Sequence, residues 1–143
     1  MTFPETGYSL SVRFLSYWRG NGGLSVFGSP IDSEQQPDGR VVQWFERQRF
    51  ELHTENRGTP YEVELGRLGT EALAQQGHDW LTFPKADPQT PHYVAETSHA
   101  MTPQFWDYWR SHGLEFGDRG ISYRESLALF GYPLSEAQMA RCI

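Results

Sequence analysis

Apolar residues follow a helical spacing early in the chain. Val12 and Leu15 lie three residues apart, and Phe14 and Trp18 lie four apart, which are the spacings of neighbours on a helix surface. Ser11, just before them, is a residue type that commonly caps helices. A glycine-rich segment comes next, and glycine tolerates the left-handed conformation that ends many helices. The pattern predicts a helix over about residues 12–20.

The same pattern returns 91 positions later. Thr102 is a capping residue, Pro103 suits the first helical position, and Gly113 can end the helix. We therefore predict a second helix over about residues 103–112. The pairs that keep this offset are Glu5/Glu96, Thr6/Thr97, Ser11/Thr102, Phe14/Phe105, Tyr17/Tyr108, Trp18/Trp109, Arg19/Arg110 and Gly22/Gly113. This many matches at one offset indicate an internal duplication.

A second shared signature is Phe-Gly-x-Pro, found at residues 27–30 and again at 130–133. Gly permits an unusual backbone angle and Pro fixes the next bend, so the signature predicts a rigid turn with a buried Phe. Between helix and turn, the second copy holds about a dozen additional residues, among them Glu115 to Glu125. We expect this insertion at the surface, where loops vary freely.

Residues 41–45 are rich in β-branched and aromatic residues, and residues 49–53 and 61–65 alternate between apolar and polar residues. Both patterns are typical of strands. The residues of the third strand that we expect to face the core are Tyr61, Val63 and Leu65. The predicted fold class is α+β, with two pseudo-repeated short helices packed on a small antiparallel β-sheet.

A chain of this length is expected to form a single domain, residues 1–143. Within it we expect a complete repeat unit at 1–76, a linker at 77–92 and a truncated second unit at 93–143. The second helix has no strand pattern of its own after it. We expect that helix, with Phe105 on its core-facing side, to pack on the sheet of the first unit or on a second copy of the chain, as in a homodimer.

The composition narrows the function classes. A net charge of −6 disfavours nucleic acid as a partner, because phosphate binding needs a basic face. No apolar run is long enough for a membrane span, and the N-terminal residues lack the pattern of a signal peptide. The single cysteine, Cys142, rules out a disulfide within one chain and has no motif around it.

The order of the short motifs resembles a known family. The segments Gly22-Gly23-Leu24, Phe27-Gly28-Ser29-Pro30, Gln43-Trp44-Phe45-Glu46 and Val63-Glu64-Leu65-Gly66 come in the order used by LGFP-type repeats. A closer resemblance is to tandem domains of unknown function in exported proteins of green non-sulfur bacteria. It covers most of residues 3–72 and, by its first half, 93–136. The resemblance implies an extracellular or cell-envelope setting, and it supplies no catalytic residues.

One alternative function is enzymatic. Glu5 and Glu96 stand at equivalent positions, and a pair of carboxylates is the machinery of glycoside hydrolysis. The chain would then be a glycoside- or cell-wall-hydrolase-like enzyme. The structural interpretation is that each Glu-Thr pair tethers the segment entering its helix. It is favoured because the Thr is repeated together with the Glu.

Other catalytic or ligand-binding signatures are missing from the sequence. His92, His99 and His112 do not have the spacing that places two metal ligands on one helix face. The glycine-rich segment at residues 20–23 follows a helix, whereas phosphate-binding loops precede one. We therefore expect no metal site and no cofactor.

The function that we predict is a non-catalytic binding or interaction module of an exported protein. Aromatic residues make up 15% of the chain, and exposed Tyr and Trp rings stack on sugars and anchor protein interfaces. The expected ligand is a cell-envelope glycan or a partner protein. The residues predicted to bind it are Tyr17, Trp44, Trp80, Trp106, Tyr108, Arg19 and Arg110.

Overall fold

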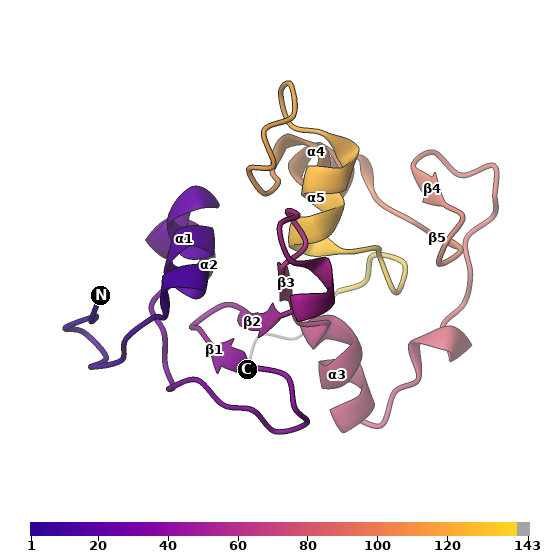
Figure 1. Cartoon of the computed structure of the whole chain (residues 1–143). Helices are drawn as coiled ribbons and strands as arrows, with labels where there is room; N and C mark the ends of the chain where they lie inside the picture. Colours follow the sequence, from indigo (N-terminus) through magenta and orange to yellow (C-terminus); the bar gives the residue numbers. More distant parts are fainter. Residues whose placement is uncertain (140–143) are drawn as a thin grey trace. The chain divides into compact units, whose positions relative to one another are not determined.

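The computed structural model describes residues 1–139 and shows an α+β fold (Figure 1). Within these residues there are five α-helices, a three-stranded antiparallel sheet and a two-stranded antiparallel sheet. The predicted fold class is therefore confirmed. In this part of the chain, no helix combines the length and the apolar character needed to cross a lipid bilayer. Cys142 lies outside the described residues.

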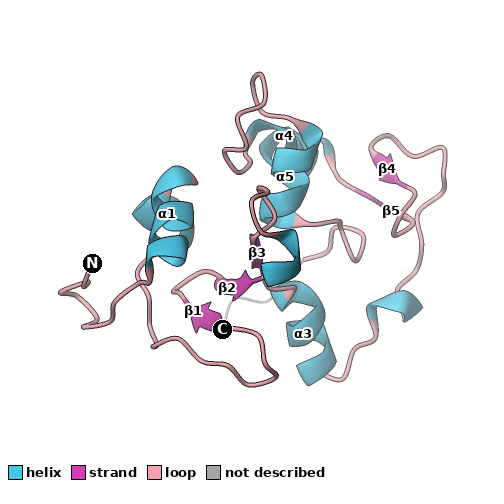
Figure 2. Cartoon of the chain, viewed as in Figure 1, coloured by secondary structure: helices cyan, strands magenta, loops and turns pink. Residues whose placement is uncertain are grey.

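The chain forms two compact units. The first unit contains Met1–Leu68 together with Leu114–Gly117. The second unit contains Gly69–Gly113 and the chain from Asp118 onward. Figure 2 shows that the helices and strands of both units are short and that loops join them, in keeping with nine Pro and fourteen Gly residues.

In the first unit, two helices precede a three-stranded sheet. The elements are α1 (Val12–Gly20), α2 (Gly23–Phe27), β1 (Val42–Trp44), β2 (Arg49–Leu52), the 3-10 helix η1 (Thr54–Asn56) and β3 (Val63–Leu65). The strands pair in the order β1-β2-β3, and both pairs are antiparallel. The first helix and the three strands lie where the sequence pattern predicted them, whereas α2 was not predicted.

The core of the first unit is centred on Phe50 of β2, which is fully buried. Its ring lies 4.0 to 5.6 Å, centroid to centroid, from four other rings. These rings belong to Phe14, Tyr17, Phe27 and Phe45. Because Phe14 and Tyr17 come from α1 and Phe27 ends α2, this one Phe ties both helices to the sheet.

One residue of the predicted third strand departs from the expectation. Val63 is buried as predicted, but Tyr61 is exposed. The reason is that β3 begins only at Val63, so Tyr61 lies in the turn before the strand. The prediction that Tyr61 faces the core is wrong. Its ring instead contacts Phe116 edge-on, at a centroid distance of 5.3 Å.

The second unit has helices and a two-stranded sheet but no three-stranded sheet among its described residues. Its elements are α3 (Leu68–Gln75), which begins at the last residue of the first unit, η2 (Trp80–Thr82), β4 (Tyr93–Val94), β5 (His99–Ala100), α4 (Pro103–Ser111) and α5 (Tyr123–Phe130). Helix α4 is the second predicted helix. The β4–β5 hairpin and α5 were not predicted.

Residues that match in sequence make matching hydrogen bonds. In each copy the helix Trp donates its indole N–H to the carbonyl oxygen of the Gly in the Phe-Gly-x-Pro turn. The bonds are Trp18 to Gly28 at 2.9 Å and Trp109 to Gly131 at 3.0 Å. The hairpin before each helix matches as well: the paired residues are Thr2 with Ser9 and Tyr93 with Ala100.

The insertion of the second copy is not a simple surface loop. Its start belongs to the first unit: Leu114 is buried, and the backbone N–H of Glu115 donates to Asn21 Oδ1 at 2.7 Å. Its end forms the start of α5, where Ser122 and Glu125 make a reciprocal capping box. Glu125 is buried, so the prediction that the insertion lies at the surface is wrong for this residue.

Candidate functional site

A group of exposed rings lies on α4 and α5 of the second unit, and we call it the aromatic face. It consists of Phe105, Tyr108, His112 and Phe130. The exposed fractions of the three largest hydrophobic members are 61% for Phe105, 58% for Tyr108 and 41% for Phe130. Phe105 and Tyr108 share one side of α4 because they are three positions apart, and His112 follows directly after the helix as its C-cap. The prediction that Phe105 faces the core is therefore wrong.

Local hydrogen bonds fix the position of these rings. The hydroxyl of Thr102 caps α4 by accepting the backbone N–H of Phe105 at 3.3 Å. His112 Nδ1 lies 2.7 Å from the carbonyl oxygen of Tyr108, and the two rings stack at 3.9 Å. The ring of Phe130, at the end of α5, lies 5.7 Å from that of Tyr108. The face is thus held by the backbone of two packed helices (Figure 1).

A second set of rings holds the two helices together. Trp109 is buried between them: its ring stacks on Trp106 at 5.7 Å and meets Tyr123 of α5 edge-on at 5.1 Å. Trp106 in turn stacks on His92 at 4.9 Å. These contacts explain why one side of α4 is fixed while the side bearing the aromatic face is open to solvent.

The predicted binding residues of the second unit have different surroundings. Tyr108 belongs to the aromatic face, and Trp106 is half-buried in the row of rings just described. Trp80 is half-buried in η2, with its ring 6.5 Å from that of His99. Arg110 is exposed and pairs with Asp107 at 3.1 Å. Of these four residues, the structure brings only Tyr108 into the aromatic face.

The predicted binding residues of the first unit are largely used in packing. Tyr17 packs on Phe27 and Phe50. Its hydroxyl is buried and has no hydrogen-bond partner among residues 1–139, and burial raises its pKa above the ordinary value. Trp44 lies under the guanidinium of Arg49, 5.1 Å from the ring centre. Arg19 is exposed at the end of α1. Within residues 1–139, no contact joins Tyr17, Trp44 and Arg19 into one common surface.

The carboxylates of the hydrolase alternative lie in separate units. Glu5 is exposed in the turn of the first hairpin, and Glu96 is exposed in the turn of the β4–β5 hairpin. The neighbouring Thr6 and Thr97 are placed alike, since each has a buried hydroxyl for which the described part of the chain provides no hydrogen-bond partner. Glu and Thr thus occupy equivalent turn positions in the two hairpins. Both the tethering interpretation and the hydrolase alternative stay predictions.

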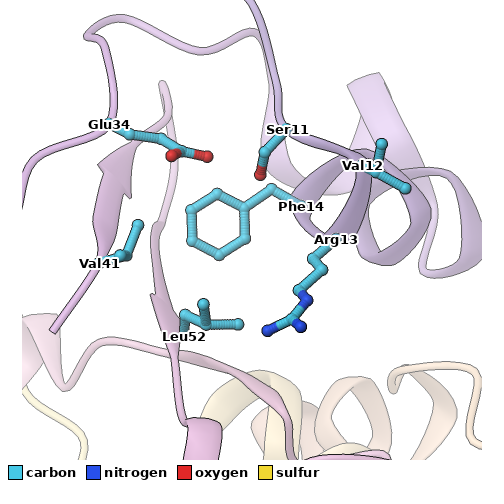
Figure 3. A pocket seen from close by; sticks show the side chains of 7 residues that line it. All are labelled: Ser11, Val12, Arg13, Phe14, Glu34, Val41 and Leu52. Atoms are coloured by element: carbon cyan, nitrogen blue, oxygen red, sulfur yellow. The ribbon is translucent and has the colours of Figure 1, made fainter.

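A shallow cavity of about 350 Å³ opens beside the start of α1 in the first unit (Figure 3). Its lining residues are Ser11, Val12, Arg13, Phe14, Glu34, Val41 and Leu52. Arg13 points along one side of it, and its Nε pairs with Glu62 at 3.4 Å. The lining offers one hydroxyl and one carboxylate, without a His or a second acid beside them, so it provides no acid–base pair for catalysis.

A charged cluster covers one side of the three-stranded sheet. His53 Nδ1 lies 2.9 Å from Glu55, and Nε2 lies 3.3 Å from both Glu51 and Glu64. Arg49 pairs with Glu51 at 2.7 Å. Among residues 1–139, no group of three or more His, Cys, Asp and Glu side chains is arranged to hold a metal ion. In this cluster His53, which follows β2, contacts Glu64 of β3, so the polar contacts link neighbouring strands.

The remaining histidine of interest, His99, is buried in the second unit. Its Nδ1 lies 2.8 Å from Glu136 Oε2, and the same oxygen accepts the backbone N–H of Ala100 at 3.1 Å. The pair fixes the β5 segment against the chain that follows the Phe-Gly-x-Pro turn. His92 and His112 are both used in ring stacking, so the three histidines serve packing rather than a shared site.

Acid is expected to destabilise the protein through two carboxylates. Hydrogen bonds from Arg124, and to a smaller extent from Ser122, hold the pKa of Asp118 at about 2. The pKa of Glu55 is also held at about 2, first by a hydrogen bond from its own backbone and then by one from Arg40. Both folded-state pKa values lie below the ordinary ones, so their stabilisation is present above about pH 4.5 and is lost as the pH falls toward 2. Urea unfolding between pH 7 and pH 2 measures this loss.

The matched variants for the acid prediction are Asp118→Asn and Asp38→Asn. Asp118→Asn should remove part of the pH dependence of the unfolding free energy below about pH 4.5, because it removes the pair with Arg124. Asp38→Asn should leave that pH dependence unchanged, since no ion pair of Asp38 is seen in the described part of the chain. An Asp118→Asn variant with the pH dependence of the parent chain would contradict the assignment.

The comparisons of this chain with known proteins identify no relative. No protein-family model, no curated protein and no solved structure matches the chain. The resemblance to the domains of exported bacterial proteins therefore stays a prediction, and the function has to be argued from the chain's own geometry.

Proposed function

We propose that this chain is a non-catalytic interaction module that binds a partner protein through the aromatic face. The observation that carries the proposal is the joint exposure of Phe105, Tyr108 and Phe130. Together they leave roughly 300 Å² of aromatic surface in water. Contiguous apolar patches of this size on soluble proteins are often functional, and Tyr and Phe are enriched at interfaces.

The geometry of the face favours a protein over a glycan. Sugars stack on open, flat ring faces, but one side of the Tyr108 ring is already covered by His112. The rings of Tyr108 and Phe130 are tilted by 53° and form an uneven surface rather than a platform. An uneven apolar surface suits interdigitating side chains of a partner.

The chemistry of the face also favours binding over catalysis. Its four members include no carboxylate, Ser or Cys, and His112 Nδ1 is engaged with the carbonyl oxygen of Tyr108. We include in the proposal the extracellular or cell-envelope setting that the resemblance implies. The partner would then be a protein of the same compartment.

The test is site-specific photo-crosslinking in an envelope extract of the cells that make the protein. A photoreactive amino acid replaces Phe105, and the expected result is a discrete crosslinked protein whose yield drops when Tyr108→Ser is added. The matched control carries the same photoreactive group at Val12 of α1, which is 80% exposed, and should not capture that protein. Equal capture at both positions, or binding of the parent chain to envelope polysaccharide that Tyr108→Ser abolishes, would contradict the proposal.

A further inference from the structure

An amide side chain in the first unit is held between two segments that are far apart in the sequence. Asn21 directly follows α1 and is 8% exposed. Its Nδ2 donates to the carbonyl oxygen of Tyr17 at 2.9 Å, and its Oδ1 accepts the backbone N–H of Glu115 at 2.7 Å. Both polar atoms of the amide are therefore engaged, one by α1 and the other by the segment Leu114–Gly117, which belongs to the same unit.

Asn21 is followed by Gly22, and this is the only Asn-Gly pair in the chain. In such a pair the backbone nitrogen of the Gly can attack the side-chain carbonyl carbon of the Asn, because no side chain on the Gly hinders the approach. The new C–N bond closes a cyclic succinimide, while the side-chain nitrogen takes up the proton of the Gly N–H and leaves as ammonia. Water then adds across one C–N bond of the ring and gives Asp or isoaspartate. The pair thus has a chemical route to deamidation.

The fold requires both residues of this pair. Gly22 has a φ of +110°, and a Cβ added to it would lie 2.3 Å from Cγ2 of Val26, so a residue with a side chain would clash there. Asn21 has to donate to one neighbour and accept from another, which an amide can do and a carboxylate cannot. The structure that needs the pair also retains its reactivity.

The second copy holds the end of its helix without an amide. Its equivalents of Asn21 and Gly22, at the offset of 91, are His112 and Gly113. His112 Nδ1 lies 2.7 Å from the carbonyl oxygen of Tyr108, in the place of the bond that Asn21 makes to α1. An imidazole has no amide nitrogen to lose, so this chemistry is confined to the first unit.

The two hydrogen bonds of Asn21 oppose ring closure. The side chain has to rotate toward the following peptide bond before the Gly22 nitrogen can reach its carbonyl carbon. This rotation takes the amide away from its partners and leaves the buried acceptor and donor without their bonds. Closure therefore requires this part of the unit to open, and its rate follows the fraction of molecules in which residues 114–117 are undocked.

We propose that Asn21 is a deamidation site that the docked segment Leu114–Gly117 protects. When the segment is undocked, Gly22 closes the succinimide and Asn21 becomes Asp or isoaspartate. The product lacks the donor that faced the carbonyl oxygen of Tyr17 and places a negative charge at a buried position, so the end of α1 does not regain its original structure. Undocking then leaves a lasting chemical change. The proposal concerns the first unit and does not depend on the function proposed for the aromatic face.

The test measures the rate at which Asn21 loses ammonia, by mass spectrometry of the peptide that contains it. In native buffer at mildly alkaline pH, the parent chain should react at least about tenfold more slowly than in guanidinium chloride, because the reaction needs opening. Glu115→Pro removes the backbone N–H that Asn21 accepts, and it should react at least about tenfold faster than the parent chain in native buffer. The matched control is Glu115→Ala, which keeps that N–H and loses only an exposed side chain, so it should react like the parent chain.

Equal rates for the parent chain with and without denaturant would overturn the proposal, as would a denatured chain in which Asn21 is stable. A folded Glu115→Pro variant that reacts no faster than the parent chain would overturn it as well. If circular dichroism shows that this variant is unfolded, Leu114→Ala, which removes a buried side chain of the segment, takes its place under the same criterion. Asn56, which precedes Arg57, serves as the internal reference in every sample.

Discussion

Replacing Phe50 by Ala is expected to lower the free energy of unfolding of the first unit by about 3–5 kcal/mol. Four rings surround this side chain, and they come from both helices and the sheet. Its removal leaves a cavity where these elements meet, because the four rings cannot all move inward together. Urea unfolding followed by circular dichroism, together with amide exchange in β2, measures the loss.

The control for this prediction keeps most of the apolar volume. Phe50→Leu should cost clearly less than Phe50→Ala, since the cavity that it leaves is smaller. A loss of less than about 1 kcal/mol for the Ala variant would show that the unit can repack around the gap, and that Phe50 is not its centre.

The second large effect is expected in α4. Trp109→Ala should cost about 3–5 kcal/mol, because it removes a buried indole, its stacking on Trp106 and its hydrogen bond to Gly131. Phe105→Ala, one helical turn earlier, should change stability by less than about 0.5 kcal/mol, because Phe105 is exposed. Amide exchange in α5 reports on both variants.

These two variants together test the orientation of α4. Equal losses for Trp109→Ala and Phe105→Ala would mean that both rings are buried and that the aromatic face is not open. A large loss for Trp109 alone, with unchanged folding of the Phe105 variant, is the result that the structure requires.

Much of the fold could be predicted from the sequence because its signals are local. The caps and the apolar spacing predicted α1 and α4. The β-branched and aromatic content predicted β1, and alternation predicted β2 and β3. Helix α2 has only five residues and begins at a glycine, so it lacks the length that a periodic pattern needs. Its C-cap is Gly28, whose carbonyl oxygen accepts the indole N–H of Trp18, a residue ten positions earlier.

The candidate site was harder to predict, since exposure is not a local property. Phe14 and Phe105 have the same place in the same helical pattern, and the pattern alone assigns both to a core. What separates them is the presence or absence of a covering sheet. The available signal was the missing strand pattern after the second Phe-Gly-x-Pro turn. That signal predicts equally well that α4 packs on another sheet and that its rings stay open, and only the exposure of Phe105 decides between them.

The hydrogen bond between Glu115 and Asn21 affects the order in which the protein can be made. Leu114–Gly117 belong to the first unit although 45 residues of the second unit, Gly69–Gly113, precede them along the chain. A ribosome that has released only residues 1–68 has therefore not yet produced all of the first unit. Tyr61 lacks its ring contact with Phe116, and Asn21 Oδ1 lacks its donor, until the later segment arrives. Completion of the first unit then requires closure of a long loop, which is a slow, non-local step.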